Sequence, residues 1–303
     1  MEILDGKLVS GVVLKEIKEE IEKIGISGGR PPGITVVIVG EDPASEIYVR
    51  SKDKKAGKLG FRSEIIRLSD SISQKELMKV IAGLNQDPLV DAILVQLPLP
   101  DKFNEWEILD TIDPDKDVDR FHPLNLGKIM VNRSDIFPCT PAGIIRILDE
   151  YKIDVSGMDC VIVGRSFIVG KPVANMLTNR NATVTICHSR TKNIGEKLKK
   201  ADLIIAALGR PGFVTGDMVK NGAILIDVGI NRIDTYEDAE KLCDKNQLEK
   251  FKSKGYAVTG DISKEAFTAS SFYTPVPGGV GPMTVAMLMQ NTLNLYKKRV
   301  LEK

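Results

Sequence analysis

Histidine is scarce in this chain of 303 residues, which contains only His122 and His188. A histidine-based metal site or a Ser-His-Asp triad therefore has little to be built from, and we expect both histidines to be structural and no metal to be bound. The four cysteines lack the spacing of a metal site. Cys160 and Cys187 fall within strand patterns, which predicts buried thiols and fits a reducing compartment.

Charge of one sign and long hydrophobic runs are also lacking. A net charge of +1 argues against a nucleic-acid partner held by bulk electrostatics. No apolar run approaches the roughly 20 residues that cross a membrane. The opening residues, MEILDG, have neither the basic start of a secretion signal nor the Arg/Ser-rich character of a transit peptide. We therefore expect a cytoplasmic protein with no membrane and no nucleic-acid partner.

What the chain does have is a glycine turn between a strand pattern and a helix pattern. A short β-branched run, residues 160–163, ends at Gly164, and a helical pattern opens at Pro172. Gly164 allows a tight turn and the close approach of a ligand, and the helix N-terminus beyond it suits a phosphate. The spacing Gly-x-Ser-x-x-x-Gly differs from the usual Gly-x-Gly-x-x-Gly. A dinucleotide site and an ordinary strand–helix turn are equally compatible with this segment alone.

The residues after the next strand pattern, 182–187, favour the dinucleotide site. An NAD site usually carries an acidic residue here, on the ribose, whereas this chain has Ser189 and Arg190. A carboxylate would repel a 2′-phosphate, but these side chains would bind one, which favours NADP. Arg190 taken alone could also be a plain surface cation. Two further strand patterns, 202–208 and 223–228, complete a Rossmann-like domain with a parallel sheet.

The first half of the chain also alternates strands with helices. A helix pattern over 8–24 precedes GITVVIVG at 33–40, which predicts a strand buried on both faces, and Asp42-Pro43 then starts a helix. Tyr48 and Lys52 lie one turn apart on that helix. Further strands at 61–68 and 90–97 and a helix at 73–85 predict a second α/β domain. Gln96 ends its last strand, where open α/β sheets bind ligands.

Two irregular segments remain. Residues 113–125 are polar and contain prolines, which is typical of a solvated linker, although Phe121 would be unusual in one. The segment TPVPGGVGP at 274–282 predicts an uncommon loop path and a cis X–Pro bond. We expect the helix that follows, 284–296, to return and pack on the first domain.

Five motifs occur in a fixed order, and they resemble one known family. They are Tyr48-x-x-x-Lys52, Gln96-Leu-Pro-Leu-Pro, Asp117-Val-Asp119, Gly164-Arg-Ser-x-x-Val-Gly-x-Pro172 and Pro275-x-Pro-Gly-Gly-Val-Gly-Pro282. Together they closely resemble the bifunctional methylenetetrahydrofolate dehydrogenase/methenyltetrahydrofolate cyclohydrolase family of the bacterial, single-polypeptide kind. The resemblance covers nearly the whole chain. It implies two α/β domains flanking a cleft, in which residues 1–140 with 275–303 bind folate and 141–274 form a Rossmann-like NADP-binding domain. It also implies a homodimer.

The resemblance implies an NADP-dependent oxidation of 5,10-methylenetetrahydrofolate to the methenyl compound, followed by hydrolysis to 10-formyltetrahydrofolate. It makes Lys52 the residue that moves protons, Gln96 its hydrogen-bond partner and Asp119 the residue that binds the pterin ring, while Tyr48 stacks on the folate. The implied catalytic set is Lys52, Gln96 and Asp119. The implied substrate-binding residues are Tyr48, Lys52, Gln96, Asp119, Pro277 and Gly278. The implied cofactor-binding residues are Gly164, Arg165, Ser166, Ser189, Arg190 and Ile230.

Alternatives stay open at Lys52 and Arg120. Lys52 lies among Lys54, Lys55 and Lys58, and a lysine-rich helix is ordinarily a solvated face. Arg120 stands where the family usually has glycine, and we expect it to add bulk and positive charge beside the pterin site. A dehydrogenase of the same family with weak cyclohydrolase activity is therefore one alternative. A non-catalytic dinucleotide-binding protein is another.

Overall fold

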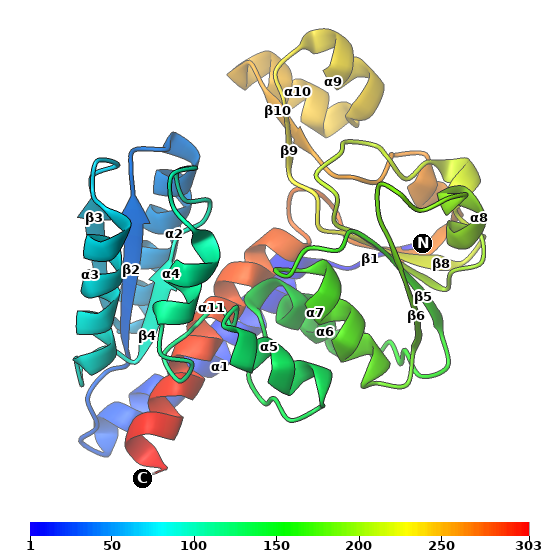
Figure 1. Ribbon diagram of the computed structural model, residues 1–303. Helices are drawn as coiled ribbons and strands as arrows, with labels where there is room; N and C mark the ends of the chain where they lie inside the picture. Colours follow the sequence, from blue (N-terminus) through cyan, green and yellow to red (C-terminus); the bar gives the residue numbers. More distant parts are fainter. Residues whose placement is uncertain (303) are drawn as a thin grey trace. The chain divides into compact units, whose positions relative to one another are not determined.

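The computed structural model describes residues 1–302, with Ala44 described by its backbone alone, and it divides the chain into two compact units (Figure 1). The six-stranded unit consists of Met1–Ser10 and Thr140–Thr284. The three-stranded unit consists of Gly11–Cys139 and the chain from Val285 onward. Both are α/β units, which confirms the predicted fold class.

The sheet of the three-stranded unit is parallel, in the order β3 (Arg62–Leu68), β2 (Gly33–Val39), β4 (Ala92–Val95). Every residue of the central strand β2 is buried, as its unbroken apolar run predicts. Helices α2 (Pro43–Leu59) and α3 (Gln74–Gln86) connect the strands in turn. The carboxyl ends of the three strands therefore point the same way, and Gln96 follows the end of β4.

Helix α2 begins and ends at the residues that local chemistry dictates. The Asp42 carboxylate accepts a hydrogen bond of 2.8 Å from the Ser45 amide, and Pro43 occupies the first turn. Gly60 ends the helix in the left-handed region, at φ 84°, and its N–H returns to the carbonyls of Ala56 and Gly57. These two caps hold the helix that presents Tyr48 and Lys52.

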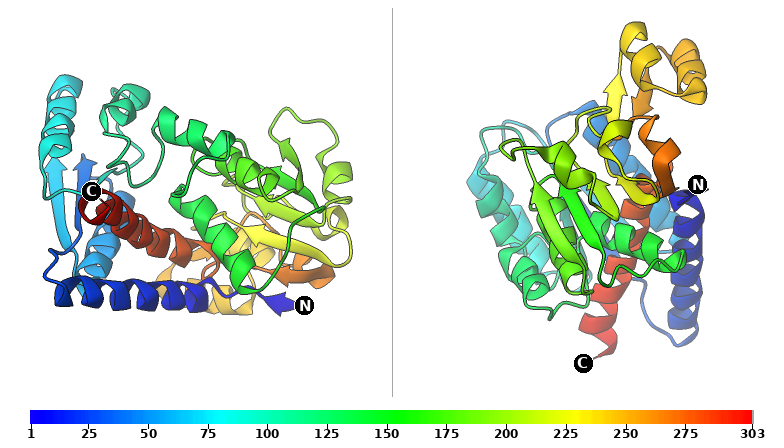
Figure 2. Two further views of the ribbon diagram at one scale, coloured as in Figure 1. Left: turned by 90° about the horizontal axis from the view of Figure 1, so that it is seen from below. Right: turned by 90° about the vertical axis from the view of Figure 1, so that its right-hand side faces the viewer.

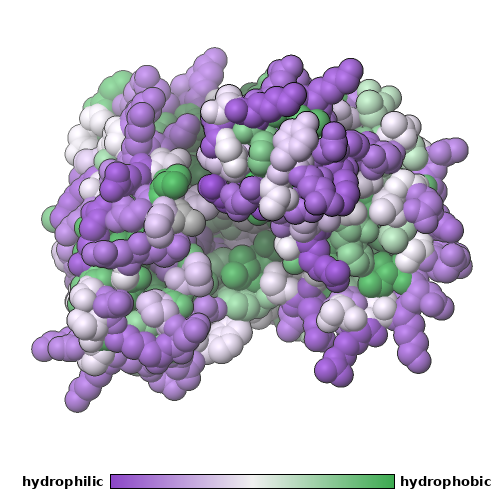
Figure 3. All heavy atoms as spheres, turned by 90° about the horizontal axis from the view of Figure 1, so that it is seen from above, coloured by the Kyte–Doolittle hydropathy of each residue, from purple (hydrophilic) through white to green (hydrophobic). Residues whose placement is uncertain are grey.

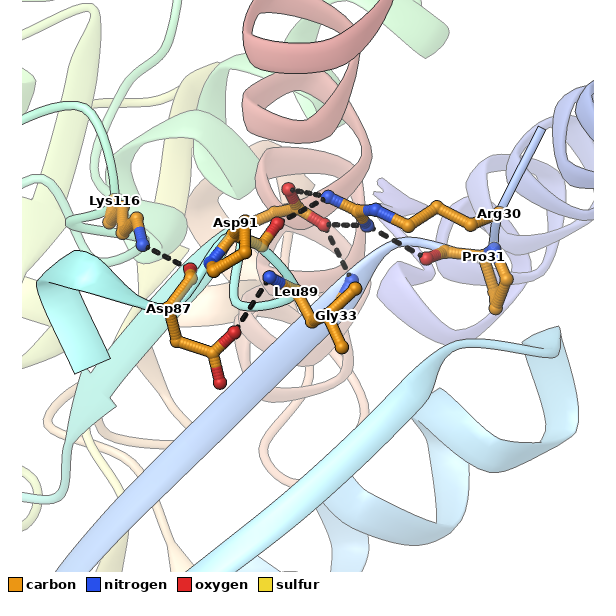
Figure 4. A network of polar contacts seen from close by, with 8 residues as sticks. Arg30, Pro31, Gly33, Asp87, Leu89, Asp91 and Lys116 are labelled. Atoms are coloured by element: carbon orange, nitrogen blue, oxygen red, sulfur yellow. Dashed lines mark hydrogen bonds and ion pairs between the residues drawn. The ribbon is translucent and has the colours of Figure 1, made fainter. Parts of the chain in front are cut away.

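A buried polar network joins the amino-terminal ends of β2 and β4 (Figure 4). The Asp91 carboxylate, fully buried, accepts hydrogen bonds from Arg30 at 2.6 and 2.7 Å and from the Gly33 amide at 2.8 Å. Lys116 donates to the carbonyls of Leu84 and Asp87, and burial lowers its pKa to about 8. Because Asp91 is ion-paired with Arg30 and the Lys116 amino group is hydrogen-bonded to two carbonyls, the network fixes the strand ends opposite Gln96.

The C-terminal helix returns to the three-stranded unit, which confirms the prediction made for it. Helix α11 (Val280–Tyr296) continues into a short π-helix, η3 (Lys297–Leu301). Lys297 Nζ lies 2.6 Å from a carboxylate oxygen of Glu20 on α1 (Gly6–Ile26), and the Arg30 guanidinium lies 5.0 Å from the ring centroid of Tyr296. Figure 2 shows α1 in dark blue and α11 in red.

The segment 113–125 is ordered and not a solvated linker. Asp117 forms a parallel bridge with Ile93 beside β4, and its buried carboxylate accepts hydrogen bonds at 2.9 Å from the amides of Arg120 and His122 and from Asn125 Nδ2. Burial raises the pKa of Asp117. His122 then caps α5 (Pro123–Met130), which follows α4 (Glu105–Thr111) in the chain. The turn is held by one buried side chain, Asp117, and not by a repeating apolar face. The sequence therefore shows no periodicity in this segment.

The six-stranded unit confirms the predicted Rossmann-like parallel sheet. Its strand order is β1, β11, β8, β7, β5, β6, and each neighbouring pair is parallel; β5 and β6 lie side by side in the right-hand view of Figure 2. The strands are β1 (Glu2–Ile3), β5 (Asp159–Val163), β6 (Thr183–Cys187), β7 (Leu203–Ala206), β8 (Ala223–Asp227) and β11 (Ser270–Tyr273). The helices are α6 (Cys139–Glu150), α7 (Gly170–Thr178), α8 (Ile194–Leu198) and the 3-10 turns η1 (Gly216–Met218) and η2 (Ala266–Ala269). Strand β1, from the first residues of the chain, extends the sheet next to β11.

Between β8 and β11 the chain forms a small excursion, which Figure 1 shows in yellow and orange, away from the strands of the main sheet. It contains β9 (Asn231–Ile233), α9 (Tyr236–Leu242), α10 (Lys245–Lys254) and β10 (Ala257–Thr259), with β9 and β10 antiparallel. Its buried hydrophobic residues are Ile233, Ala239, Cys243 and Ala257. The excursion therefore carries an apolar cluster of its own.

Hydrophilic side chains cover most of the face in Figure 3, and hydrophobic ones reach it in smaller areas. In residues 1–302, no helix has both the length and the apolar character needed to span a bilayer. Cys139, Cys160, Cys187 and Cys243 are all free and buried.

Candidate functional site

Lys52 and Gln96 meet at the carboxyl edge of the three-stranded sheet. Lys52 Nζ, on α2, donates a hydrogen bond of 2.8 Å to Gln96 Oε1. The Gln96 backbone amide donates to the Val37 carbonyl of β2 at 2.8 Å, and its side-chain Nε2 donates to the Leu97 carbonyl at 2.5 Å. Gln96 is thus held through its backbone and its Nε2 group, so its Oε1 is left to orient the lysine.

Asp119 has a half-buried carboxyl group that interacts electrostatically with the amino group of Lys52. Removal from water raises the pKa of Asp119, and the charge of Lys52 opposes that rise. The Cys139 thiol donates to Asp119 Oδ1 at 3.6 Å and to the Val118 carbonyl at 3.7 Å. Burial raises the pKa of Cys139 well above its ordinary value, so the thiol stays protonated and remains a hydrogen-bond donor.

Tyr48 lies one turn before Lys52 on α2, and 46% of its surface is exposed. Its ring is accessible to a planar ligand. Lys54 and Lys58 are exposed, as expected for a solvated lysine-rich face, whereas Lys52 is half-buried and bonded to Gln96. The structure therefore sets Lys52 apart from the exposed lysines around it.

Arg120 does not add its charge beside Asp119, contrary to expectation. Its backbone is in the left-handed region, at φ 62°, and its guanidinium donates to the Pro114 carbonyl at 2.8 Å. The positive charge of Arg120 interacts electrostatically with the carboxyl groups of Asp117, Asp115 and Asp135. The turn that follows Asp119 therefore carries the Arg120 side chain away from that carboxylate.

The glycine turn after β5 packs tightly against the protein's own backbone, so it requires glycine at two positions. Gly164 has φ 139°, and a Cβ there would lie 2.3 Å from the Ala207 carbonyl oxygen. A Cβ at Gly170 would lie 2.3 Å from the Gly164 carbonyl oxygen. Ser166 Oγ accepts from the amides of Val169 and Gly170 at the start of α7, and Arg165 and Ser166 are exposed. Helix α7 begins at Gly170, two residues before the predicted Pro172.

The other predicted cofactor residues lie at the same edge of the six-stranded sheet. Ser189 and Arg190 are exposed and follow β6, while Ile230 follows β8 and is 53% exposed. His188 Nδ1 accepts from the Arg190 amide at 3.2 Å, which agrees with the structural role expected of this histidine. Because parallel strands share one carboxyl edge, all six predicted cofactor residues gather there.

Pro277 and Gly278 lie in the six-stranded unit, apart in sequence and unit from Lys52. The Val276–Pro277 peptide bond is cis, as predicted for this loop. Gln247 Nε2 donates to the Val276 carbonyl at 2.7 Å, and the Lys7 amide donates to the Gly278 carbonyl at 3.1 Å. Pro277 is exposed and Gly278 is buried. The loop is therefore held from two other segments of its own unit.

Sequence reasoning missed two residues that support Asp119. One is Cys139, noted only as a scattered cysteine. The other is Asn291 on α11, whose Nδ2 donates to the carbonyls of Val118 and Phe137 at 3.0 and 2.9 Å and contacts Cys139 Sγ at 3.5 Å. The sequence feature that could have indicated Asn291 is the presence of an asparagine within an apolar helix pattern. Within residues 1–302, no group of three or more His, Cys, Asp or Glu side chains could hold a metal ion.

Comparison with known proteins gives one consistent family. The family model described as "Tetrahydrofolate dehydrogenase/cyclohydrolase, catalytic domain" matches residues 4–119, and the model of the NAD(P)-binding domain of the same family matches residues 138–300. The chain is 47% identical to "Bifunctional protein FolD" of Chlorobium chlorochromatii, over 98% of this chain and 99% of that protein. It is also 47% identical to the protein of that name from a Sulfurihydrogenibium species, over the full length of both.

Comparison with solved structures gives the same family. The bifunctional FolD methylenetetrahydrofolate dehydrogenase/cyclohydrolase of Campylobacter jejuni matches with a TM-score of 0.90 and 42% identity, over 99% of this chain and 100% of that one. A Trypanosoma brucei dehydrogenase-cyclohydrolase, solved with NADP and an inhibitor, matches with a TM-score of 0.88 and 35% identity, over 98% and 97% of the two chains. This chain belongs to the tetrahydrofolate dehydrogenase/cyclohydrolase family.

Proposed function

We propose that this protein oxidises 5,10-methylenetetrahydrofolate to 5,10-methenyltetrahydrofolate with NADP and hydrolyses the product to 10-formyltetrahydrofolate. The observation that carries the proposal is the 2.8 Å hydrogen bond from Lys52 to Gln96 within reach of the Asp119 carboxyl group. A lysine held by an amide oxygen beside a carboxyl group suits proton transfer on a cationic folate. The second requirement, a dinucleotide site, is supported by the glycine turn and by the family match to an NAD(P)-binding domain.

In the oxidation, the bound nicotinamide supplies the hydride acceptor. The chain's own residues bind and orient. The turn that begins at Gly164 would hold the pyrophosphate near the N-terminus of α7, and Ser189 and Arg190 would hold the 2′-phosphate. Arg165, Ser166 and Ile230 complete the proposed cofactor set. This step needs no protein acid or base, since the folate nitrogens stabilise the cationic product, so proximity and orientation do the work.

In the hydrolysis, water adds to the methenyl carbon and the ring opens, so protons must move. Lys52 accepts and releases them, and Gln96, whose Oε1 can only accept hydrogen bonds, keeps the amine in place. Asp119 accepts hydrogen bonds from the pterin amino and ring N–H groups, and Tyr48 stacks on the folate. Pro277 and Gly278 contribute backbone contacts to the substrate.

The proposal extends to domains, assembly and compartment. We assign folate binding to residues 1–140 with 275–303, and NADP binding to 141–274, whose parallel Rossmann-like sheet supports that assignment. We also propose a homodimer in the cytoplasm.

One assay tests the function: methylenetetrahydrofolate oxidation followed in parallel with NADP⁺ and NAD⁺, with methenyl hydrolysis followed separately. We expect both activities, with NADP⁺ preferred. Arg190→Gln should raise the KM for NADP⁺ about tenfold and leave that for NAD⁺ unchanged, because a charge-assisted phosphate contact is lost. Lys252→Gln, which removes another exposed cation of the same unit, is the control. If neither nucleotide is reduced in a folate-dependent way, the protein is not this enzyme.

A further inference from the structure

A cationic cavity lies within the three-stranded unit, where the turn after Asp119 meets the C-terminal helix. Its volume is about 440 Å³, within the range of small-molecule sites. Four cations line it together with the Lys298–Asp135 ion pair and the carboxylate of Asp115. The four cations are Arg120, Lys128, Arg133 and Arg299. We call this space the Arg120 cavity.

Arg120 is the buried part of this cavity. Only 4% of the residue is exposed, and its Nε has no hydrogen-bond partner within residues 1–302. A buried, unsatisfied guanidinium nitrogen is costly, and so is a side chain at φ 62°, where glycine is favoured. The fold therefore retains a strained and incompletely paired arginine whose side chain lines the cavity.

The other charges do not neutralise the cavity. Lys298 is paired with Asp135, and Asp115 offsets one further cation, which leaves an excess of three positive charges among the seven charged side chains. Arg299 also helps to lower the pKa of buried Lys116, as a neighbouring like charge does. Positive charge is thus in excess among the side chains that line the cavity, while the buried carboxylate of Asp117, outside that lining, also interacts with Arg120.

We infer that the Arg120 cavity binds a small phosphorylated metabolite with two phosphate groups. Each phosphate carries about −1.5 to −2 charges at neutral pH, so two of them match the excess of three cations. Arginine forks bind phosphate oxygens with two parallel hydrogen bonds, and Arg120, Arg133 and Arg299 supply three such groups from three segments of the unit. The site does not include Lys52, Gln96 or Asp119, and it does not depend on the proposed reaction.

The test is calorimetric titration of the full-length protein with sodium pyrophosphate as the probe, in the presence of saturating NADP⁺ so that the glycine turn is filled. We expect saturable binding at one site. Arg133→Gln and Arg299→Gln should each weaken the affinity about tenfold, since each removes a charge-assisted contact. Lys79→Gln, an exposed cation of α3 outside the cavity, is the matched control and should bind as the wild type does.

Arg133→Lys keeps the charge and should retain most of the affinity, which separates lost binding from lost folding. The inference is overturned if pyrophosphate does not bind saturably, or if Arg133→Gln and Arg299→Gln both bind it with the affinity of the wild type.

Discussion

Lys52 Nζ and Gln96 Oε1 are 2.8 Å apart, although the two residues are 44 positions apart in the chain. One lies in the middle of α2 and the other directly follows β4, so the bond exists only because the parallel sheet brings a crossover helix and a strand end together. An amide oxygen accepts hydrogen bonds and does not titrate. The pair therefore couples one proton-carrying group to one fixed acceptor.

Replacing Gln96 tests whether that acceptor matters. Gln96→Ala leaves the Lys52 amine without its fixed partner, so we expect hydrolysis of the methenyl compound to slow about a hundredfold, within the range of a misplaced acid–base group. Oxidation should fall much less, because it needs no protein proton transfer. The two reactions are followed separately by absorbance. Gln86→Ala, at the exposed end of α3, is the control, and an equal loss of both activities would argue against the role given to Gln96.

Asp119 gives a pH dependence with a defined sign. Burial raises its pKa above the ordinary 3.8, so its carboxylate becomes protonated at a higher pH than an exposed aspartate would as the solution is acidified. Since the carboxylate is the form proposed to bind the pterin, the kcat/KM for folate should fall as pH decreases through this raised pKa. Asp119→Asn should have low kcat/KM and lack this acid limb. An unchanged acid limb in the variant would assign the titration to another group.

Local signals predicted those elements that local chemistry determines. Asp42-Pro43 and Gly60 were enough to place both ends of α2, and the apolar run 33–40 was enough to bury β2. The pairing of β1 with β11 could not be predicted, because it joins residues 2–3 to residues 272–273 and leaves no periodicity in a strand of two residues. The direction of Arg120 was equally hidden, since it depends on a left-handed backbone and the buried carboxylate of Asp117.

The proposed cofactor residues are predicted by residue type, and the structure adds only their placement. Gly164, Ser189 and Arg190 follow from the strand–turn–helix pattern, and the structure places them at one sheet edge. The support of Asp119 by Cys139 and Asn291 was missed, because those residues come from two helices far apart in the chain.

A methyl group at Gly164 should destroy the nucleotide turn. Gly164→Ala places a Cβ 2.3 Å from the Ala207 carbonyl oxygen at φ 139°, so we expect NADP⁺ binding to be lost and stability to fall. Gly157→Ala is the control, because Gly157 also has a positive φ, of 76°, but nothing within 4 Å of the added carbon. That variant should lose only about 1 kcal/mol and still bind NADP⁺. Fluorescence titration measures the NADP⁺ affinity of each variant, and thermal unfolding measures its stability. Normal NADP⁺ affinity in Gly164→Ala would exclude this turn as the NADP⁺ site.

The buried Asp91 carboxylate depends on Arg30 for its compensation. Arg30→Met removes the two hydrogen bonds to Asp91, of 2.6 and 2.7 Å, together with those to the Pro31 and Pro88 carbonyls. It leaves the fully buried carboxylate with the Gly33 amide as its remaining partner (Figure 4). We expect the free energy of unfolding, measured in urea, to fall by about 3 kcal/mol. Arg50→Met, which breaks an exposed ion pair with Glu46, should leave it nearly unchanged. Equal effects of the two substitutions would show that burial of the carboxylate is not what matters.

The most direct test of the whole account is Lys52→Met, with oxidation of methylenetetrahydrofolate, hydrolysis of methenyltetrahydrofolate and NADP⁺ affinity each measured on the same preparation. Methionine keeps an unbranched apolar side chain that ends at Cε and lacks the amino group that bonds to Gln96. The account predicts that hydrolysis is lost while NADP⁺ binds as in the wild type. Full hydrolytic turnover in this variant would contradict it.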